Sequence, residues 1–279
     1  MTRVPPCAAA ALVLVACLTA CNRQAPAPAT PAAPGAATTA AAPAAASTTV
    51  AAPLADVVET TPRYVIGVSY PKEAAPYPGL VAALTKYAGD ARGDLMDAVE
   101  GLGNDTPSAP YELSLAYTTL VDSPSLVAIG ADGSLYTGGA HGSPLIARWV
   151  WLPQQNAMLT SDKLVPDAAG WQAISDFVRE QLHTALSQRI DADDVPTESR
   201  ADMLKDATRM IDDGTEPKAD AFSEFEPRVG RDGRIDALRF VFPPYQVGPY
   251  ADGTQTVDVP AEVLLPHVAP PYRSLFRGG

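Results

Sequence analysis

The stretch from Ala25 to Pro53 most constrains how this chain can fold, because nothing in it can build a hydrophobic core. Of its 29 residues, 15 are Ala and 6 are Pro, and none is charged. Repeated Pro interrupts helices, and such small side chains bury little apolar surface. We therefore expect a semi-extended tether here. It is either a spacer that lifts the rest of the chain off a membrane or a filler of no required length.

A secretion signal precedes this tether. Arg3 supplies the positive charge of such a signal and residues 8–16 its short apolar segment, which is too short to span a membrane. The signal ends in Leu18-Thr19-Ala20-Cys21, which resembles the lipobox of bacterial lipoproteins. The resemblance implies removal of residues 1–20 and lipidation of Cys21. The alternative is an ordinary signal peptide in which Cys21 is incidental.

The lipobox resemblance also implies a location. Lipoproteins of diderm bacteria that lack Asp after the lipidated Cys usually go to the outer membrane, and Asn22 follows Cys21 here. An anchor of several acyl chains holds stably where a single chain would not. We expect a lipid-anchored chain in the cell envelope, at the periplasmic face of the outer membrane, with residues 21–60 as its lipidated tether.

Cysteine content and charge exclude several classes of function. The three cysteines are Cys7, Cys17 and Cys21, so a disulfide or a Cys-based metal centre is not expected in the rest of the chain. The formal net charge of −12 argues against a general nucleic-acid binder, which needs a basic surface. No two of the 3 histidines have the spacing of a metal-binding helix. We expect no metal, no cofactor and no nucleic-acid partner.

Apolar patterning predicts a folded body that starts near Thr61. Strands cluster in runs that two or three helices interrupt, which favours an α+β fold with antiparallel sheets. Spacings of three and four residues predict helices over Gly79–Leu102, Asp167–Ile190 and Thr197–Gly214. Alternation predicts strands over Tyr64–Tyr70, Tyr111–Val121, Ser125–Gly130 with a turn at Asp132-Gly133, Leu145–Leu152, Phe225–Val229, Ile235–Phe242 and Thr254–Val259.

A glycine-rich loop around His141 is the first candidate site. It contains Gly138, Gly139 and Gly142 after Tyr136, a density that indicates a tight turn or the close approach of a ligand. An imidazole in such a loop can bind a ligand, act as a base, or simply fasten the loop through hydrogen bonds. No Gly-x-Ser-x-Gly motif of a hydrolase nucleophile is present.

A second loop carries two tyrosines. Tyr245 and Tyr250 lie in a Pro- and Gly-rich segment that ends in Asp252-Gly253. The rings form either an exposed binding surface or a rigid loop packed on a sheet. Nearby, residues 191–232 hold 13 acidic and 6 basic residues. This acidic region is either a solvated face or a patch that steers a cationic partner.

These two loops carry a family resemblance. The sequence YTGGAH at 136–141, with FPPYQVGPYADGTQTVDVP at 242–260, resembles the C-terminal domain of the bacterial RsiV-type family. Residues 64–71 and the helix after them resemble its companion domain, which also accompanies the peptidoglycan deacetylase PdaC. The resemblance implies a companion domain over 61–110 and an RsiV-type domain over 111–279, both catalogued as domains of unknown function.

The RsiV-type module binds lysozyme, so the resemblance implies a non-catalytic module for a protein such as a lysozyme-like muramidase. We expect neither an anti-sigma segment nor a deacetylase domain in this sequence. The candidate ligand-binding residues are Tyr136, Gly138, Gly139, His141, Tyr245, Tyr250 and Asp252. One alternative is direct peptidoglycan binding, with sugars stacked on Trp149, Trp151, Tyr245 and Tyr250. Another is a hydrolase that uses His141 with a carboxylate.

Overall fold

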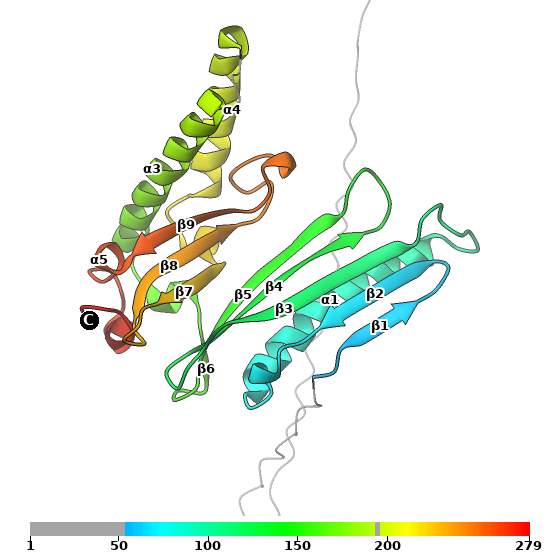
Figure 1. The fold of residues 1–279 in the computed structure, drawn as a ribbon, viewed down its shortest axis with the longest axis horizontal. Coiled ribbons are helices and arrows are strands. Elements are labelled where there is room, and N and C mark those ends of the chain that lie inside the picture. The colour runs from blue at the N-terminus through cyan, green and yellow to red at the C-terminus, as the bar shows by residue number, and fades with distance from the viewer. Residues whose placement is uncertain (1–53, 193–195) are drawn as a thin grey trace, which may run out of the picture. The chain divides into compact units, whose positions relative to one another are not determined.

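Two sheets and the helices that cover them make up the described part of the chain (Figure 1). A computed structural model describes residues 54–192 and 196–279, so the predicted signal, Cys21 and most of the tether lie outside the described residues. The first sheet has six strands in the order β1-β2-β3-β4-β5-β6, and the second has three in the order β7-β8-β9. The predicted α+β class is confirmed.

The first half of the body contains β1 (Val57–Thr60), β2 (Tyr64–Ser69), α1 (Pro78–Gly101), β3 (Tyr111–Asp122), β4 (Val127–Tyr136), β5 (Ser143–Leu152) and β6 (Ala157–Leu159). The second half contains α2 (Ser161–Leu164), α3 (Ala168–Ala192), α4 (Thr197–Gly214), β7 (Phe225–Val229), β8 (Ile235–Phe242), β9 (Gln255–Pro260) and α5 (Ala261–Leu264). Among these described helices, none is both long and apolar enough to cross a bilayer.

Helix α1 covers one face of the first sheet through the apolar stripe that its sequence predicts. Leu80, Leu84 and Leu95 are fully buried in a core that they share with β2, β3 and β4. The hydroxyl of Tyr117 on β3 donates to the carbonyl oxygen of Leu84 at 2.7 Å. Helix and sheet are thus joined by burial of apolar side chains and by a buried hydrogen bond.

Two details of the first sheet differ from the predictions. Strands β2 and β3 pair in parallel because α1 crosses between them, so this sheet is mixed and not wholly antiparallel. Strand β1 pairs with β2 through Val57 to Thr60, so the sheet begins before Thr61, where we expected the body to start. Four residues are too few to show a clear alternation, which explains why the sequence pattern misses this strand.

The predicted turn at Asp132-Gly133 is wrong. Both residues lie inside β4, where Gly133 pairs with Leu115 of β3. A Cβ atom at Gly133 would collide with the carbonyl oxygen of Ser114 and would lie 2.9 Å from the Cα of Leu115. Glycine is therefore needed here for close approach of two strands and not for a turn. By contrast, Gly233 and Gly253, which also follow Asp, have positive φ and lie in connections between strands.

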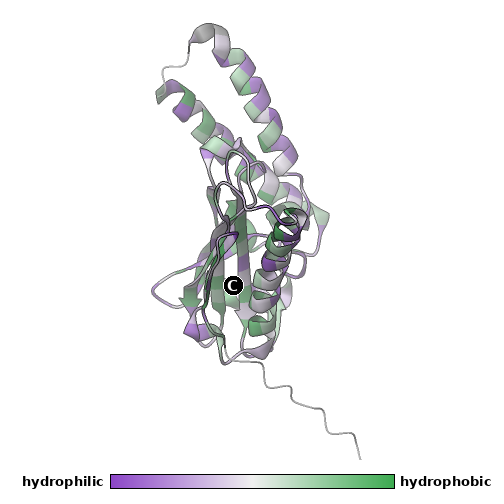
Figure 2. Cartoon of the chain, turned by 90° about the vertical axis from the view of Figure 1, so that its right-hand side faces the viewer, coloured by the Kyte–Doolittle hydropathy of each residue, from purple (hydrophilic) through white to green (hydrophobic). Residues whose placement is uncertain are grey.

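Helices α3 and α5 pack on the second sheet. Leu238, Phe240 and Phe242 are fully buried, in agreement with the predicted alternation along β8, and Phe222, which precedes β7, packs on the two phenylalanines. Asp167 caps α3, since its carboxylate accepts the backbone N–H of Gly170 at 2.8 Å. Figure 2 shows hydrophilic and hydrophobic residues alternating along the helices, as expected of helices that bury one face.

Candidate binding site

The two candidate loops lie side by side in the fold. His141 lies in the β4–β5 connection, and Tyr245 and Tyr250 lie in the β8–β9 connection. The rings of His141 and Tyr250 stack with centroids 3.9 Å apart and an interplanar angle of 15°. The ring of Tyr245 lies 5.7 Å from that of Tyr250. We call His141, Tyr245 and Tyr250 the aromatic cluster.

Hydrogen bonds orient the imidazole of this cluster. Nδ1 of His141 lies 3.1 Å from the carbonyl oxygen of Gly142, which can only accept, so Nδ1 carries the proton. In the neutral ring, Nε2 then accepts the hydroxyl proton of Tyr245 at 3.2 Å. The hydrolase alternative requires a carboxylate or serine oxygen at His141, and no described residue provides one in hydrogen-bond reach. The contacts are those of a ring held in place as part of a surface.

Tyr245 combines backbone strain with exposure. Its φ is +75°, which is rare for a residue with a Cβ atom, and the residue is 55% exposed. The next residue explains how the strain is maintained. The side-chain amide of Gln246 donates at 2.9 Å to the carbonyl oxygens of both Gly214 and Ala221, which fixes the loop against the end of α4. Strain held at an exposed aromatic residue is typical of a functional site.

The glycine-rich loop shapes this site from the other side. Gly138 and Gly139 both have φ near +100°, at 99° and 98°, so the chain reverses through conformations that residues with side chains avoid. The hydroxyl of Tyr136 lies 3.3 Å from the carbonyl oxygen of Gly139 and donates to it. Tyr136, Gly138 and Gly139 therefore form the loop that presents His141, and among the described residues no hydrogen bond joins the side chain of Tyr136 to Tyr245 or Tyr250.

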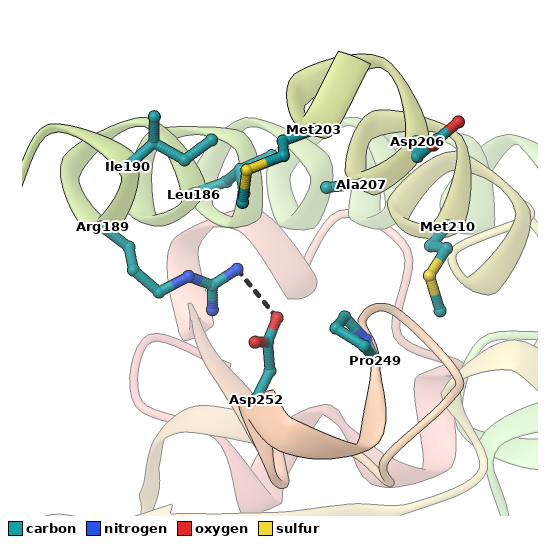
Figure 3. Close-up of a pocket in the computed structure, with 9 residues that line it drawn as sticks. All are labelled: Leu186, Arg189, Ile190, Met203, Asp206, Ala207, Met210, Pro249 and Asp252. Carbon is teal, nitrogen blue, oxygen red and sulfur yellow. Dashed lines mark ion pairs between the residues drawn. The ribbon is translucent and has the colours of Figure 1, made fainter. Parts of the chain in front are cut away.

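Asp252 lies at the other end of the tyrosine loop and opens onto a groove. Its carboxylate lies 2.8 Å from Nη2 of Arg189 on α3, an ion pair that ties the loop to the helix (Figure 3). The groove has a volume of about 380 Å³. It is lined by Leu186, Arg189 and Ile190 of α3, Met203, Asp206, Ala207 and Met210 of α4, and Pro249 and Asp252. We call it the methionine groove.

The composition of the methionine groove is apolar inside and acidic at its border. Met203 is 48% exposed, and Figure 3 shows Met203 and Met210 on α4, above the loop that carries Pro249. Asp206 lines the groove, and Asp202 is exposed one helical turn away. Sequence reasoning missed this groove because its walls come from two helices and a loop, each of which shows only its own periodicity.

Trp149 and Trp151 do not lie beside the aromatic cluster, so the four aromatic residues of the glycan-binding alternative do not form one surface. Both indoles point from β5 toward α1. The ring of Trp149 packs edge-on against that of Tyr87, with the two centroids 5.4 Å apart, and Trp151 is 4% exposed. In an alternating strand these two positions share one face, and here that face packs against α1. Elsewhere, no group of three or more His, Cys, Asp or Glu in the described ranges is arranged to hold a metal.

Comparison with known protein families identifies one family model that matches part of this chain. A family model described as "Protein of unknown function (DUF3298)" matches residues 159–262, a range that includes Tyr245, Tyr250 and Asp252 but not His141. No curated protein matches the chain. The RsiV-type and PdaC-type resemblances stay predictions.

Two solved structures of DUF3298 family members are similar to the chain. One, from Bacteroides fragilis NCTC 9343, is 19% identical with a TM-score of 0.47 and covers 81% of this chain and 96% of its own. The other, from Pseudomonas aeruginosa PAO1, is 15% identical with a TM-score of 0.45 and covers 77% of this chain and 88% of its own.

Proposed function

We propose that this chain is a non-catalytic binding module of the cell envelope and that its ligand is a cationic protein, of which a lysozyme-like muramidase is the leading candidate. The observation that carries this proposal is Tyr245, an exposed ring on a strained backbone beside the His141–Tyr250 stack. The resemblance to the RsiV-type family supplies the candidate ligand.

The aromatic cluster has the properties of a binding anchor. Tyrosine gives a large amphipathic contact area and loses little conformational entropy when it binds. Here Tyr245 is already held by His141, so even less freedom remains to be lost. Rigid exposed aromatic residues of this kind dominate the binding energy of many protein interfaces.

The methionine groove suggests what the ligand presents next to this anchor. Met203 and Met210 are flexible and polarizable, so they can adapt to an inserted apolar side chain. Asp202 and Asp206 lie at the border, and residues 191–232 carry 13 acidic against 6 basic side chains. A ligand surface with an apolar residue beside Lys or Arg fits both features.

The proposal places this module on a membrane through the lipid at Cys21, with the Ala/Pro tract as a spacer toward the cell wall. The lipobox sequence supports this location. Replacing Cys21 with Ser should move the chain from the membrane fraction to the soluble fraction, while a Cys17→Ser control should stay with the membrane. If both variants stay with the membrane, the anchor at Cys21 is wrong.

Calorimetric titration of the full chain with a purified lysozyme tests the ligand. We expect binding that weakens as salt rises, because opposite charges attract through solvent. Tyr245→Ala should lower the affinity at least about tenfold, as anchor residues do. The pair Asp202→Asn/Asp206→Asn should weaken it and flatten its salt dependence. The pair Asp94→Asn/Asp97→Asn, with the same charge change on the exposed side of α1, should leave the affinity unchanged.

Two results would contradict the proposal. One is no heat of binding at either low or high salt. The other is retention of the chain by insoluble peptidoglycan that Tyr245→Ala abolishes, which would make the cell-wall polymer the ligand of the aromatic cluster.

A further inference from the structure

A second cavity lies where the two sheets meet, and it shares no residue with the aromatic cluster or the methionine groove. It is a cleft of about 500 Å³ between the start of α1, strands β5 and β6, and the segment that leads into β7. We call it the inter-sheet cleft. Its lining includes Trp149, Trp151, Thr160, Ser223 and Glu224.

Two tryptophans of β5 line the inter-sheet cleft, and one of them keeps part of its indole accessible. Trp149 is half-buried, and Trp151 is 4% exposed. The indole N–H of Trp151 is buried and has no hydrogen-bond partner among the described residues. Such a group costs free energy unless something pairs with it. Gly79 of α1 packs directly against the ring of Trp151, where a Cβ atom would collide, so this indole cannot easily turn away.

The cleft offers no unpaired cation. Arg148 also lines it, but its guanidinium is held by hydrogen bonds and ion pairs, although its buried Nε makes no hydrogen bond. Nη1 donates to the carbonyl oxygens of Ala131 and Ala147, both at 3.0 Å, and Nη2 donates to Asp132 at 3.1 Å. Nε lies 3.3 Å from the carboxylate of Glu226. An anionic ligand would therefore find no free partner here.

The remaining polar groups suit hydroxyls. The carboxyl of Glu224 accepts the backbone N–H of Arg148 and, at 3.2 Å, the hydroxyl of Ser223. Burial is the main cause that raises the pKa of Glu224, which disfavours a bare charge in the cleft. Thr160 contributes a further hydroxyl to the lining.

We infer that the inter-sheet cleft binds a single neutral pyranose unit, with its C–H face on the half-buried indole of Trp149 and its hydroxyls on Glu224, Ser223 and Thr160. Mostly apolar and aromatic walls with a few placed polar groups are typical of small-molecule sites. A pyranose has one flat apolar face and a rim of hydroxyls, and it needs no ionic partner. The inference does not depend on the proposed protein ligand, because the two sites have no residue in common.

Nuclear magnetic resonance on the full chain labelled with 15N-tryptophan tests this site. The probe is N-acetylglucosamine, with glucosamine and glucuronate as charged sugars of similar size. The chain has 3 tryptophans, so the indole resonances of Trp149 and Trp151 can be compared with that of Trp171, which lies outside the cleft. We expect saturable shifts of the first two resonances with the neutral sugar, little change at Trp171, and weaker binding of both charged sugars.

Two variants keep the inference falsifiable if one of them fails to fold. Glu224→Gln and Thr160→Val should each raise the dissociation constant about tenfold, the effect of one lost hydrogen bond. Glu180→Gln on the exposed face of α3 makes the same chemical change elsewhere and should have no effect. Absence of saturable shifts, or tighter binding of glucosamine or glucuronate than of N-acetylglucosamine, would overturn the inference.

Discussion

The hydroxyl of Tyr245 lies 3.2 Å from Nε2 of His141, although 104 residues separate the two in the chain. This contact joins the β4–β5 loop of the first sheet to the β8–β9 loop of the second. Because Nδ1 of His141 is engaged by Gly142, the imidazole has one preferred orientation toward Tyr245. The hydrogen bond thus restrains a tyrosine that remains 55% exposed.

The positive φ of Tyr245 leads to a prediction about stability. An L-residue with a Cβ atom in this backbone region costs about 1–2 kcal/mol, whereas Gly adopts it freely. Tyr245→Gly should therefore be more stable than Tyr245→Ala by about 1 kcal/mol, the reverse of the usual order. Urea unfolding of the two variants measures this difference. If the Ala variant is as stable as the Gly variant or more stable, the backbone at this position is not strained.

The close approach at Gly133 leads to a second prediction. Gly133→Ala forces a Cβ atom into the Ser114 carbonyl of the neighbouring strand, so it should lower the free energy of unfolding by about 1–3 kcal/mol. Gly67→Ala on β2 is the matched control, because a Cβ atom there meets nothing within 4 Å. The control should be neutral or stabilising by up to about 1 kcal/mol. If thermal unfolding shows that both substitutions change stability equally, the close approach of Gly133 to the Ser114 carbonyl is contradicted.

The partly buried carboxyl of Glu224 predicts a pH dependence of stability. Burial is the first cause that raises its pKa in the folded state, so the folded chain binds this proton more tightly than the unfolded chain. Stability from this group is then present below the unfolded pKa and is lost as pH rises through the folded pKa. Glu224→Gln cannot ionise, so its stability relative to the original chain should increase as pH rises through that window.

The measurement is denaturant unfolding of both chains from mildly acidic to neutral pH. The quantity to follow is the difference in the free energy of unfolding between the two chains. Exposed carboxyls such as Glu73 and Asp232, whose pKa values are lowered by hydrogen bonds, contribute equally to both chains and therefore cancel in this difference. A difference that stays constant with pH would show that Glu224 is not buried as described.

Local patterns predicted most of the secondary structure. The hairpin of Phe225–Val229 and Ile235–Phe242 forms with the predicted bounds, because strict alternation and an Asp-Gly turn are both local signals. The stripe through Leu80, Leu84 and Leu95 faces the core for the same reason. The turn predicted at Asp132-Gly133 does not form. An Asp-Gly pair can turn the chain or allow two strands to approach closely, and the sequence alone does not distinguish these two cases.

For the candidate site, too, part could be predicted from local sequence and part depended on the tertiary structure. The sequence alone determined that one loop presents His141 and another presents Tyr245 and Tyr250, since glycine, proline and aromatic residues mark loops through backbone preferences. Only the tertiary structure decided that these loops meet, that Met203 and Arg189 border one groove, and that Trp149 and Trp151 face a cleft and not the aromatic cluster. Backbone preferences act over a few residues, whereas contacts between distant segments depend on how whole sheets and helices pack to bury apolar surface.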